Sequence, residues 1–111
     1  MIDWARVAEL RDEIGPEDFD EVVELFLTEV EGAIDLLESA AGNPVVTHDQ
    51  MHFLKGAALN LGFAAVSDLC QKGEKAAAGG DAEAIPFGAV RTTFEDSKNR
   101  FLAELPLKFA A

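Results

Sequence analysis

The sequence predicts an all-α protein: an antiparallel, up-down four-helix bundle with an additional short N-terminal helix. Apolar residues recur at intervals of three and four over long segments, which is the spacing of one helix face, and glycine and proline separate these segments. No stretch is typical of a strand, because Val45-Val46 is too short to form one. A chain of 111 residues is long enough for one hydrophobic core, so we expect a single domain over 1–111.

Two helices are expected in the first part of the chain. Asp3 is a suitable N-cap for a short helix over 3–14, which ends before Gly15. Pro16 suits the first turn of the second helix, expected over 16–41, and the acidic residues after it favour the positive end of the helix dipole. At about 1.5 Å per residue, this second helix is expected to be longer than roughly 30 Å.

Three further helices complete the predicted bundle. Their expected ranges are 44–61, 64–78 and 82–105. Asn43-Pro44 supplies an N-cap and a first helical residue, while Gly62 and Gly79-Gly80 end the first two of these helices. Pro86 marks either the true start of the last helix or a kink in it, and polar residues interrupt its apolar stripe near Ser97-Lys98. Because the connections are short, neighbouring helices are expected to be antiparallel.

The composition excludes several classes of function. Nine Lys and Arg against twenty-one Asp and Glu give a net charge of −12, which repels nucleic-acid phosphates and anionic lipid surfaces. No apolar run approaches the roughly 20 residues of a membrane-spanning helix, and the acidic first residues are not typical of a signal peptide. The single cysteine, Cys70, lies at an apolar position and is expected in the core. We therefore expect a cytoplasmic monomer that binds neither nucleic acid nor membranes.

His52 is the most informative residue, because it lies in the middle of the helix predicted over 44–61. At roughly 100° per residue, Lys55 lies about 60° to one side of His52 and Gly56 about 40° to the other. Leu59 lies about 20° away, one turn further on. The opposite side of this helix is apolar, with Leu54, Ala57, Ala58 and Leu61. His52 is therefore expected to face outward.

The neighbours of His52 are unusual for a helix surface. Glycine inside a helix is less favourable than alanine by about 1 kcal/mol. Close packing against another helix is one explanation of Gly56, but its angle places it nearer His52 than the core, so we interpret it as open space beside the imidazole. Lys55 alone would be an ordinary surface lysine. Beside a phosphorylated histidine, its ammonium would offset part of the added charge.

The order His-x-Leu-Lys-Gly-Ala-Ala-x-x-Leu-Gly over 52–62 closely resembles the signature of the histidine-containing phosphotransfer (HPt) domains of multistep phosphorelays. The resemblance implies a four-helix bundle in which His52 is phosphorylated and exchanges its phosphoryl group with aspartates of receiver domains. It also implies that Lys55 orients the phosphoryl oxygens. The expected partners are response-regulator receiver domains and a histidine kinase.

The resemblance also identifies supporting residues on the helix expected over 64–78. Glu74 matches a position where some family members use a polar side chain, often glutamine, to hydrogen-bond the other ring nitrogen of the histidine. A carboxylate that accepts from Nδ1–H would leave Nε2 free as the nucleophile. The alternative for Glu74 is an ordinary surface charge pair with Lys75. Gln71, Lys72 and Lys75 are further candidates for contact with the phosphoryl group.

The sequence indicates a phosphocarrier rather than an enzyme. It has no phosphate-binding glycine loop and no kinase signature, so it is not expected to bind ATP or to catalyse transfer alone. No cofactor of its own is expected; by the resemblance, the receiver domain supplies magnesium and the acceptor aspartate. Docking is expected on the exposed faces of the second and third helices, around Val45, His48 and Leu59.

Two alternatives remain open from the residues. One is a helical interaction module that binds a receiver or a kinase and is never phosphorylated. The other is a metal-binding bundle, because His48 and His52 are four residues apart and can face the same way. The segment lacks the glutamate of the zinc-protease helix motif, and no third ligand is evident nearby.

Overall fold

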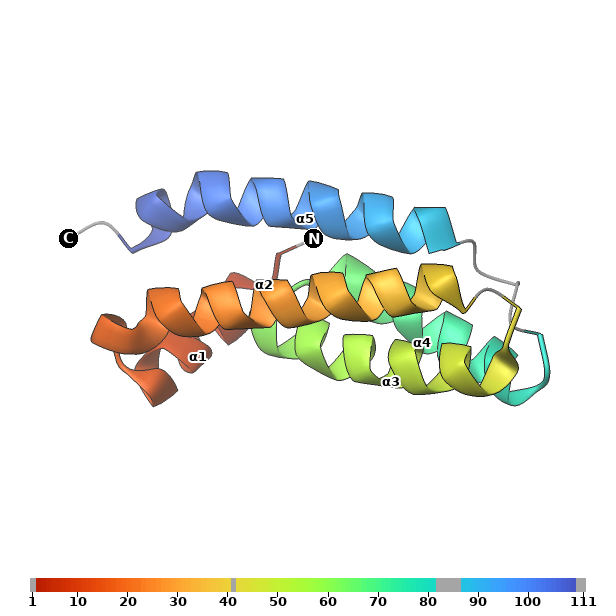
Figure 1. The fold of residues 1–111 in the computed structure, drawn as a ribbon. Helices are drawn as coiled ribbons and strands as arrows, with labels where there is room; N and C mark the ends of the chain where they lie inside the picture. Colours follow the sequence, from red (N-terminus) through yellow and green to blue (C-terminus); the bar gives the residue numbers. More distant parts are fainter. Residues whose placement is uncertain (1, 41, 82–86, 110–111) are drawn as a thin grey trace.

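The computed structural model describes residues 2–40, 42–81 and 87–109, and in these ranges it forms five helices. They are α1 (Trp4–Ile14), α2 (Pro16–Ser39), α3 (Pro44–Leu61), α4 (Ala64–Ala78) and α5 (Phe87–Lys108). Figure 1 shows α2 to α5 as an elongated bundle in which consecutive helices run in opposite directions, with α1 at one end. Within the bundle the pairs in contact are α2 with α3, α3 with α4, α4 with α5 and α5 with α2, so α2–α5 and α3–α4 form opposite sides, while α1 contacts α2 and α3. The predicted all-α bundle is confirmed.

Side-chain caps account for two of the predicted helix starts. Asp3 Oδ1 accepts a hydrogen bond from the backbone N–H of Arg6 at 3.2 Å, at the start of α1. Asn43 Oδ1 accepts from the N–H groups of Val45 and Val46 at 3.1 and 3.2 Å, at the start of α3. These caps satisfy backbone donors that have no partner within the helix.

Two helix ends differ from the sequence-based ranges. α2 ends at Ser39, before the expected residue 41, and the N–H of Ala40 closes it by donating to Leu36 O at 3.0 Å. α5 continues to Lys108, past the expected end at residue 105 and with Pro106 inside it. Residue 41 and the first part of the range 82–105, including Pro86, lie outside the described residues.

Aromatic packing explains why α5 continues beyond its proline. Phe109 follows the helix, and its ring lies 6.5 Å from Trp4 and 6.1 Å from Phe19, measured between centroids. The Arg11 guanidinium lies 4.7 Å from the centre of the same ring. These contacts hold the end of α5 against α1 and α2, and they offset the backbone hydrogen bond that Pro106 cannot donate.

The core runs along the centre of the bundle, and α3 and α4 pack closely within it. Met51 and Leu54 are fully buried on α3, as are Phe94 and Phe101 on α5, with the buried Ser97 between them. A Cβ added at Gly73 of α4 would lie 2.8 Å from Met51 Cε, so the absence of a side chain at Gly73 permits this approach. Within the described residues, no helix is both long and apolar enough to cross a bilayer.

Gly62 connects α3 to the N-terminal segment. It adopts φ +76°, and its carbonyl accepts a hydrogen bond from Asp3 N at 2.7 Å. A Cβ on Gly62 would lie 2.6 Å from the backbone oxygen of Asp3 and 2.9 Å from Val7 Cγ2. Both the backbone conformation and the available space therefore require glycine at the end of α3.

We expect Gly62→Ala to lower the free energy of unfolding by more than about 2 kcal/mol, because left-handed strain and a backbone clash act together. Gly80→Ala is the matched control: Gly80 also has a positive φ, of 91°, but a Cβ there meets nothing within 4 Å. It should cost about 1–2 kcal/mol. Chemical denaturation of both variants measures the difference. Equal losses would show that the contact with Asp3 contributes nothing.

Candidate functional site

His52 lies on the outer face of α3, near its middle. Its neighbour Met51 and the nearby Leu54 are both fully buried and fix the rotation of the helix. The side chain of His52 is therefore directed outward and is 66% exposed. This imidazole is positioned by a helix whose two ends are both capped, by Asn43 and by Gly62.

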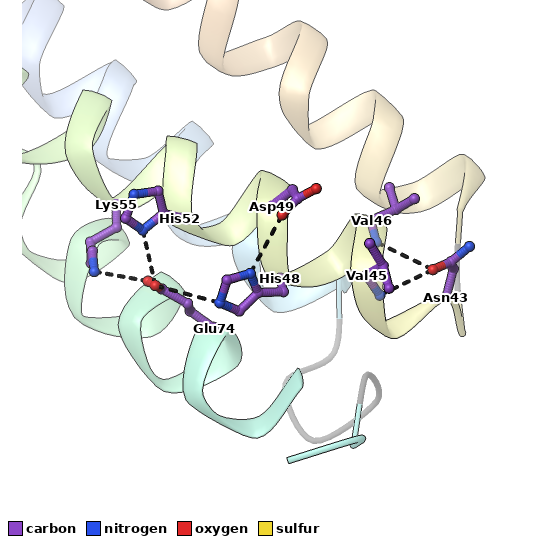
Figure 2. Close-up of polar contacts among 8 residues, drawn as sticks. All are labelled: Asn43, Val45, Val46, His48, Asp49, His52, Lys55 and Glu74. Carbon is purple, nitrogen blue, oxygen red and sulfur yellow. Dashed lines mark hydrogen bonds and ion pairs between the residues drawn. The ribbon is translucent and has the colours of Figure 1, made fainter. Parts of the chain in front are cut away.

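Glu74 on α4 connects the polar residues of this face, as Figure 2 shows. Its Oε1 lies 2.9 Å from His52 Nδ1, and its Oε2 lies 2.8 Å from Lys55 Nζ. His48 Nε2 is further away, 3.8 Å from Glu74 Oε1. The close contact between Gly73 and Met51 brings this part of α4 near α3, so a carboxylate from one helix bridges two side chains of the other.

The charge on Glu74 determines how the imidazole is held. The Lys55 ammonium, and after it His52, holds the pKa of the Glu74 carboxyl below its ordinary value. At neutral pH Glu74 is therefore ionised and can only accept hydrogen bonds. The proton of the 2.9 Å hydrogen bond consequently belongs to His52 Nδ1, which leaves the lone pair of a neutral imidazole on Nε2.

Gly56 leaves the space beside His52 open. Among the described residues, a Cβ added at this position would meet nothing within 4 Å, so none of the other four helices packs against Gly56. Close packing therefore does not account for a glycine inside α3, where it carries a helix-propensity cost of about 1 kcal/mol.

The expected docking residues lie around His52, but they are not all in contact with one another. Val45 and Leu59 are 70% and 55% exposed, one on either side of His52 along α3. The ring of His48 lies parallel to that of His52, with centroids 6.4 Å apart. Gln71 is exposed on α4, and the described polar contacts of His52 involve Glu74 rather than Gln71.

Two apolar residues near the site were not identified from the sequence. Leu36 of α2 and Phe53 of α3 are half exposed, and they line a groove of about 430 Å³ together with Gly32, Ala33, Glu29 and Gln50. The groove lies between α2 and α3, on the side of His52 where Gly56 leaves space. Phe53 could have been noticed, because it lies about 100° from His52 and away from the apolar helix face.

The structure gives no support to a metal site or a reactive thiol. Within the described residues, no group of three or more His, Cys, Asp or Glu side chains is arranged to hold a metal ion. Cys70 is fully buried, and burial raises the pKa of its thiol to about 12. The thiol is therefore protonated and inaccessible at neutral pH, as expected for a core residue.

Comparisons with known proteins agree with this arrangement, a helical bundle with an exposed histidine held by a carboxylate of the next helix, which is that of a histidine phosphotransfer domain. The family model "Hpt domain" matches residues 21–100, so the chain belongs to the Hpt domain family. A similar fold occurs in the crystal structure of histidine-containing phosphotransfer protein B (HptB) from Pseudomonas aeruginosa PAO1. That structure has a TM-score of 0.84 and 21% sequence identity, over 93% of this chain and 92% of the other. No curated protein matches the chain.

Proposed function

We propose that this protein carries a phosphoryl group on His52 Nε2 between a histidine kinase or receiver aspartate and the receiver domain of a response regulator. Membership of the Hpt domain family supports the general role, histidine phosphotransfer in a phosphorelay. One observation carries the assignment to His52: its imidazole is exposed and held at Nδ1 by Glu74, and Nε2 makes no polar contact with the residues that the structure describes. We expect the protein to act as a cytoplasmic monomer.

The transfer step needs no proton movement on this protein. The lone pair of Nε2 forms a bond to the phosphorus of an aspartyl phosphate, while the bond from phosphorus to the carboxylate oxygen breaks and the carboxylate leaves with the electron pair. Because Nδ1 keeps its proton, the product is a phosphorylated imidazolium. The ionised Glu74 offsets that positive charge, and the reverse steps pass the group to a second aspartate.

Lys55 is the cation available to the phosphoryl oxygens. Its ammonium is paired with Glu74 before transfer and is one helical turn from His52. An arriving phosphoryl group adds negative charge beside this ammonium, which attracts and orients the phosphoryl oxygens. The chain is proposed to act as a carrier without catalytic activity of its own, and the magnesium ion belongs to the acidic pocket of the receiver.

The proposed docking face combines exposed apolar residues of α3 with those of α2 that border α3. Val45 and Leu59 flank His52 along α3, while Phe53 and Leu36 border the groove between the two helices. Exposed apolar side chains grouped around a reactive residue are typical of an interaction surface. A receiver placed on this face would approach Nε2 over Gly56.

Phosphoramidate, a small phosphoryl donor that needs no cognate partner, tests the assignment directly. We expect it to place an acid-labile, base-stable phosphoryl group on His52 and not on His48, and the product should then pass the group to a receiver aspartate. Mass spectrometry of peptides and ³¹P NMR locate the group. Equal labelling of both histidines would contradict the assignment to His52, and a His52 phosphate that no receiver accepts would contradict the carrier role. No labelling of His52 would favour a non-phosphorylated interaction module.

Glu74 is proposed as a positioning residue, and its substitution should change the protonation pattern of His52. In Glu74→Leu the Nδ1–H loses its acceptor, so we expect a large part of the imidazole population to move to the Nε2–H form and transfer to slow about tenfold. Glu74→Gln keeps an acceptor oxygen and should retain the Nδ1–H form. Imidazole ¹⁵N NMR distinguishes the two forms, and an unchanged pattern in Glu74→Leu would rule out this role.

A further inference from the structure

A second surface lies on the side of the bundle away from His52. Two adjoining hollows of about 660 and 470 Å³ follow the line between α2 and α5. They share Leu27 and Leu102 as apolar lining and Glu21 and Glu24 as acidic lining, and we call them together the α2–α5 groove. Because α2–α5 and α3–α4 are opposite sides of the bundle, this groove is separate from the site around Glu74.

The groove exposes more apolar surface than the fold requires. Leu102 of α5 is 46% exposed and Leu25 of α2 is 59% exposed, although both are large apolar side chains next to the hollows. Leu27 is buried beneath them and forms an apolar floor. An elongated hollow with apolar residues on its floor and edges is suited to the apolar face of a helix.

The charge of α2 indicates what kind of helix would bind. α2 carries nine Asp and Glu and no Lys or Arg. Towards Ser39 this charge is neutralised by α5: Arg91 pairs with Asp35 at 2.6 Å and with Glu38 at 2.8 Å, and Lys98 pairs with Glu31 at 2.7 Å. Three acidic residues in this half of α2 are thus paired with cations of α5.

The other half of α2 has no such partners. The acidic residues that line the groove there are Glu17, Asp20, Glu21 and Glu24. Among the residues that the structure describes, none of these four takes part in an ion pair with a Lys or Arg side chain. Lys98 and its partner Glu31 line one end of the groove. From Glu17 to Glu24 the groove has an apolar floor and a wall of uncompensated carboxylates, which would be complemented by cationic side chains.

We propose that the α2–α5 groove binds a basic amphipathic helix of a partner protein, with Leu-type residues on one face and Lys or Arg beside them. The lining from Glu17 to Glu31 extends over about 21 Å, which corresponds to a helix of about 14 residues. A second copy of this chain is a poor occupant, because each copy carries a net charge of −12. A partner bound here leaves His52 accessible, so the groove can tether the protein while its phosphotransfer face engages a receiver.

A synthetic peptide provides the probe: 14 residues, with leucines on one helix face and lysines elsewhere, labelled for fluorescence anisotropy. A scrambled peptide of the same composition controls for charge alone. We expect the ordered peptide to bind at least about tenfold more tightly than the scrambled one. Binding should weaken with salt, and the ¹⁵N chemical shifts that change should be confined to α2 and α5 around Leu27 and Leu102.

Matched variants separate the groove from general electrostatics. Leu102→Gln should weaken binding about tenfold, whereas Leu107→Gln, on the same helix but outside the groove and 78% exposed, should not. Likewise Glu21→Gln with Glu24→Gln should weaken binding more than Asp12→Asn with Asp68→Asn, which removes the same charge from other exposed positions. Equal losses in both members of a pair would overturn the proposal. So would tight binding of the scrambled peptide, or self-association of the protein through Leu102.

Discussion

His52→Gln should abolish phosphoryl acceptance and leave the bundle folded. Glutamine has no nucleophilic ring nitrogen, so no bond to phosphorus can form at this position. The fold should tolerate the change, because the side chain is 66% exposed and the core beneath α3 is untouched. We expect the free energy of unfolding to change by less than about 1 kcal/mol. The ion pair between Lys55 and Glu74 remains available in the variant.

The measurement is transfer from a phosphorylated receiver, with circular dichroism as the check on folding. His48→Gln is the matched control, since it removes the other histidine of the same helix face. We expect His48→Gln to keep acceptance within a few fold, since His48 lies in the expected docking area but is not the acceptor, and His52→Gln to show none. If labelled phosphate entered His52→Gln at the normal rate, the carrier assignment would be wrong. Loss of acceptance in both variants would indicate a shared docking role rather than a specific acceptor.

The part of the site on α3 could be predicted from the sequence, because all of its residues lie on the same helix and regular helix geometry gives their relative positions. The angles that place Lys55 and Gly56 beside His52 depend only on residue spacing within a helix. The same holds for the exposure of Val45 and Leu59, which lie along one line of the helix surface. Helix starts were likewise predictable, since Asp3 and Asn43 act as caps through local hydrogen bonds.

The contact with Glu74 depends on how two helices are placed relative to each other. A spacing of 22 residues does not fix which turn of α4 faces His52, and only the family resemblance pointed to this position. In the structure, the approach of Gly73 to Met51 sets that register. Gly73 is therefore the residue in the sequence that indicates a close helix contact near Glu74. That its partner is Met51 is known only from the packing of α3 against α4.

Docking on the second and third helices was expected, but single-helix reasoning could not say which residues of two helices line a groove together. Leu36 and Phe53 form one groove because α2 and α3 bring them together, although they are 17 residues apart. The α2–α5 groove combines residues still further apart in the chain. The end of α5 was misplaced for the same reason: the range expected from the residues of this helix alone stops at 105, while Phe109 finds its aromatic partners on other helices. Local propensity yields to tertiary packing at such positions.

Gly56→Leu should make the protein more stable and less active, a combination that few explanations allow. The added side chain would occupy open space, since a Cβ at this position meets nothing within 4 Å. Replacing an interior helical glycine with leucine should raise the free energy of unfolding by roughly 0.5–1 kcal/mol. The same side chain would stand where the partner must approach Nε2, so we expect transfer from a receiver to slow by at least about a hundredfold.

Two comparisons show whether the leucine in Gly56→Leu slows transfer by steric hindrance. Phosphoramidate is small enough to reach Nε2 past a leucine, so its reaction with Gly56→Leu should slow by no more than a few fold, while receiver-dependent transfer is lost. Gly88→Leu, at another open helical glycine on α5, should keep normal transfer. Normal receiver transfer by Gly56→Leu would show that partners do not approach over this position. Equal loss with both donors would place the effect on the imidazole itself, through its contact with Glu74, and not on docking.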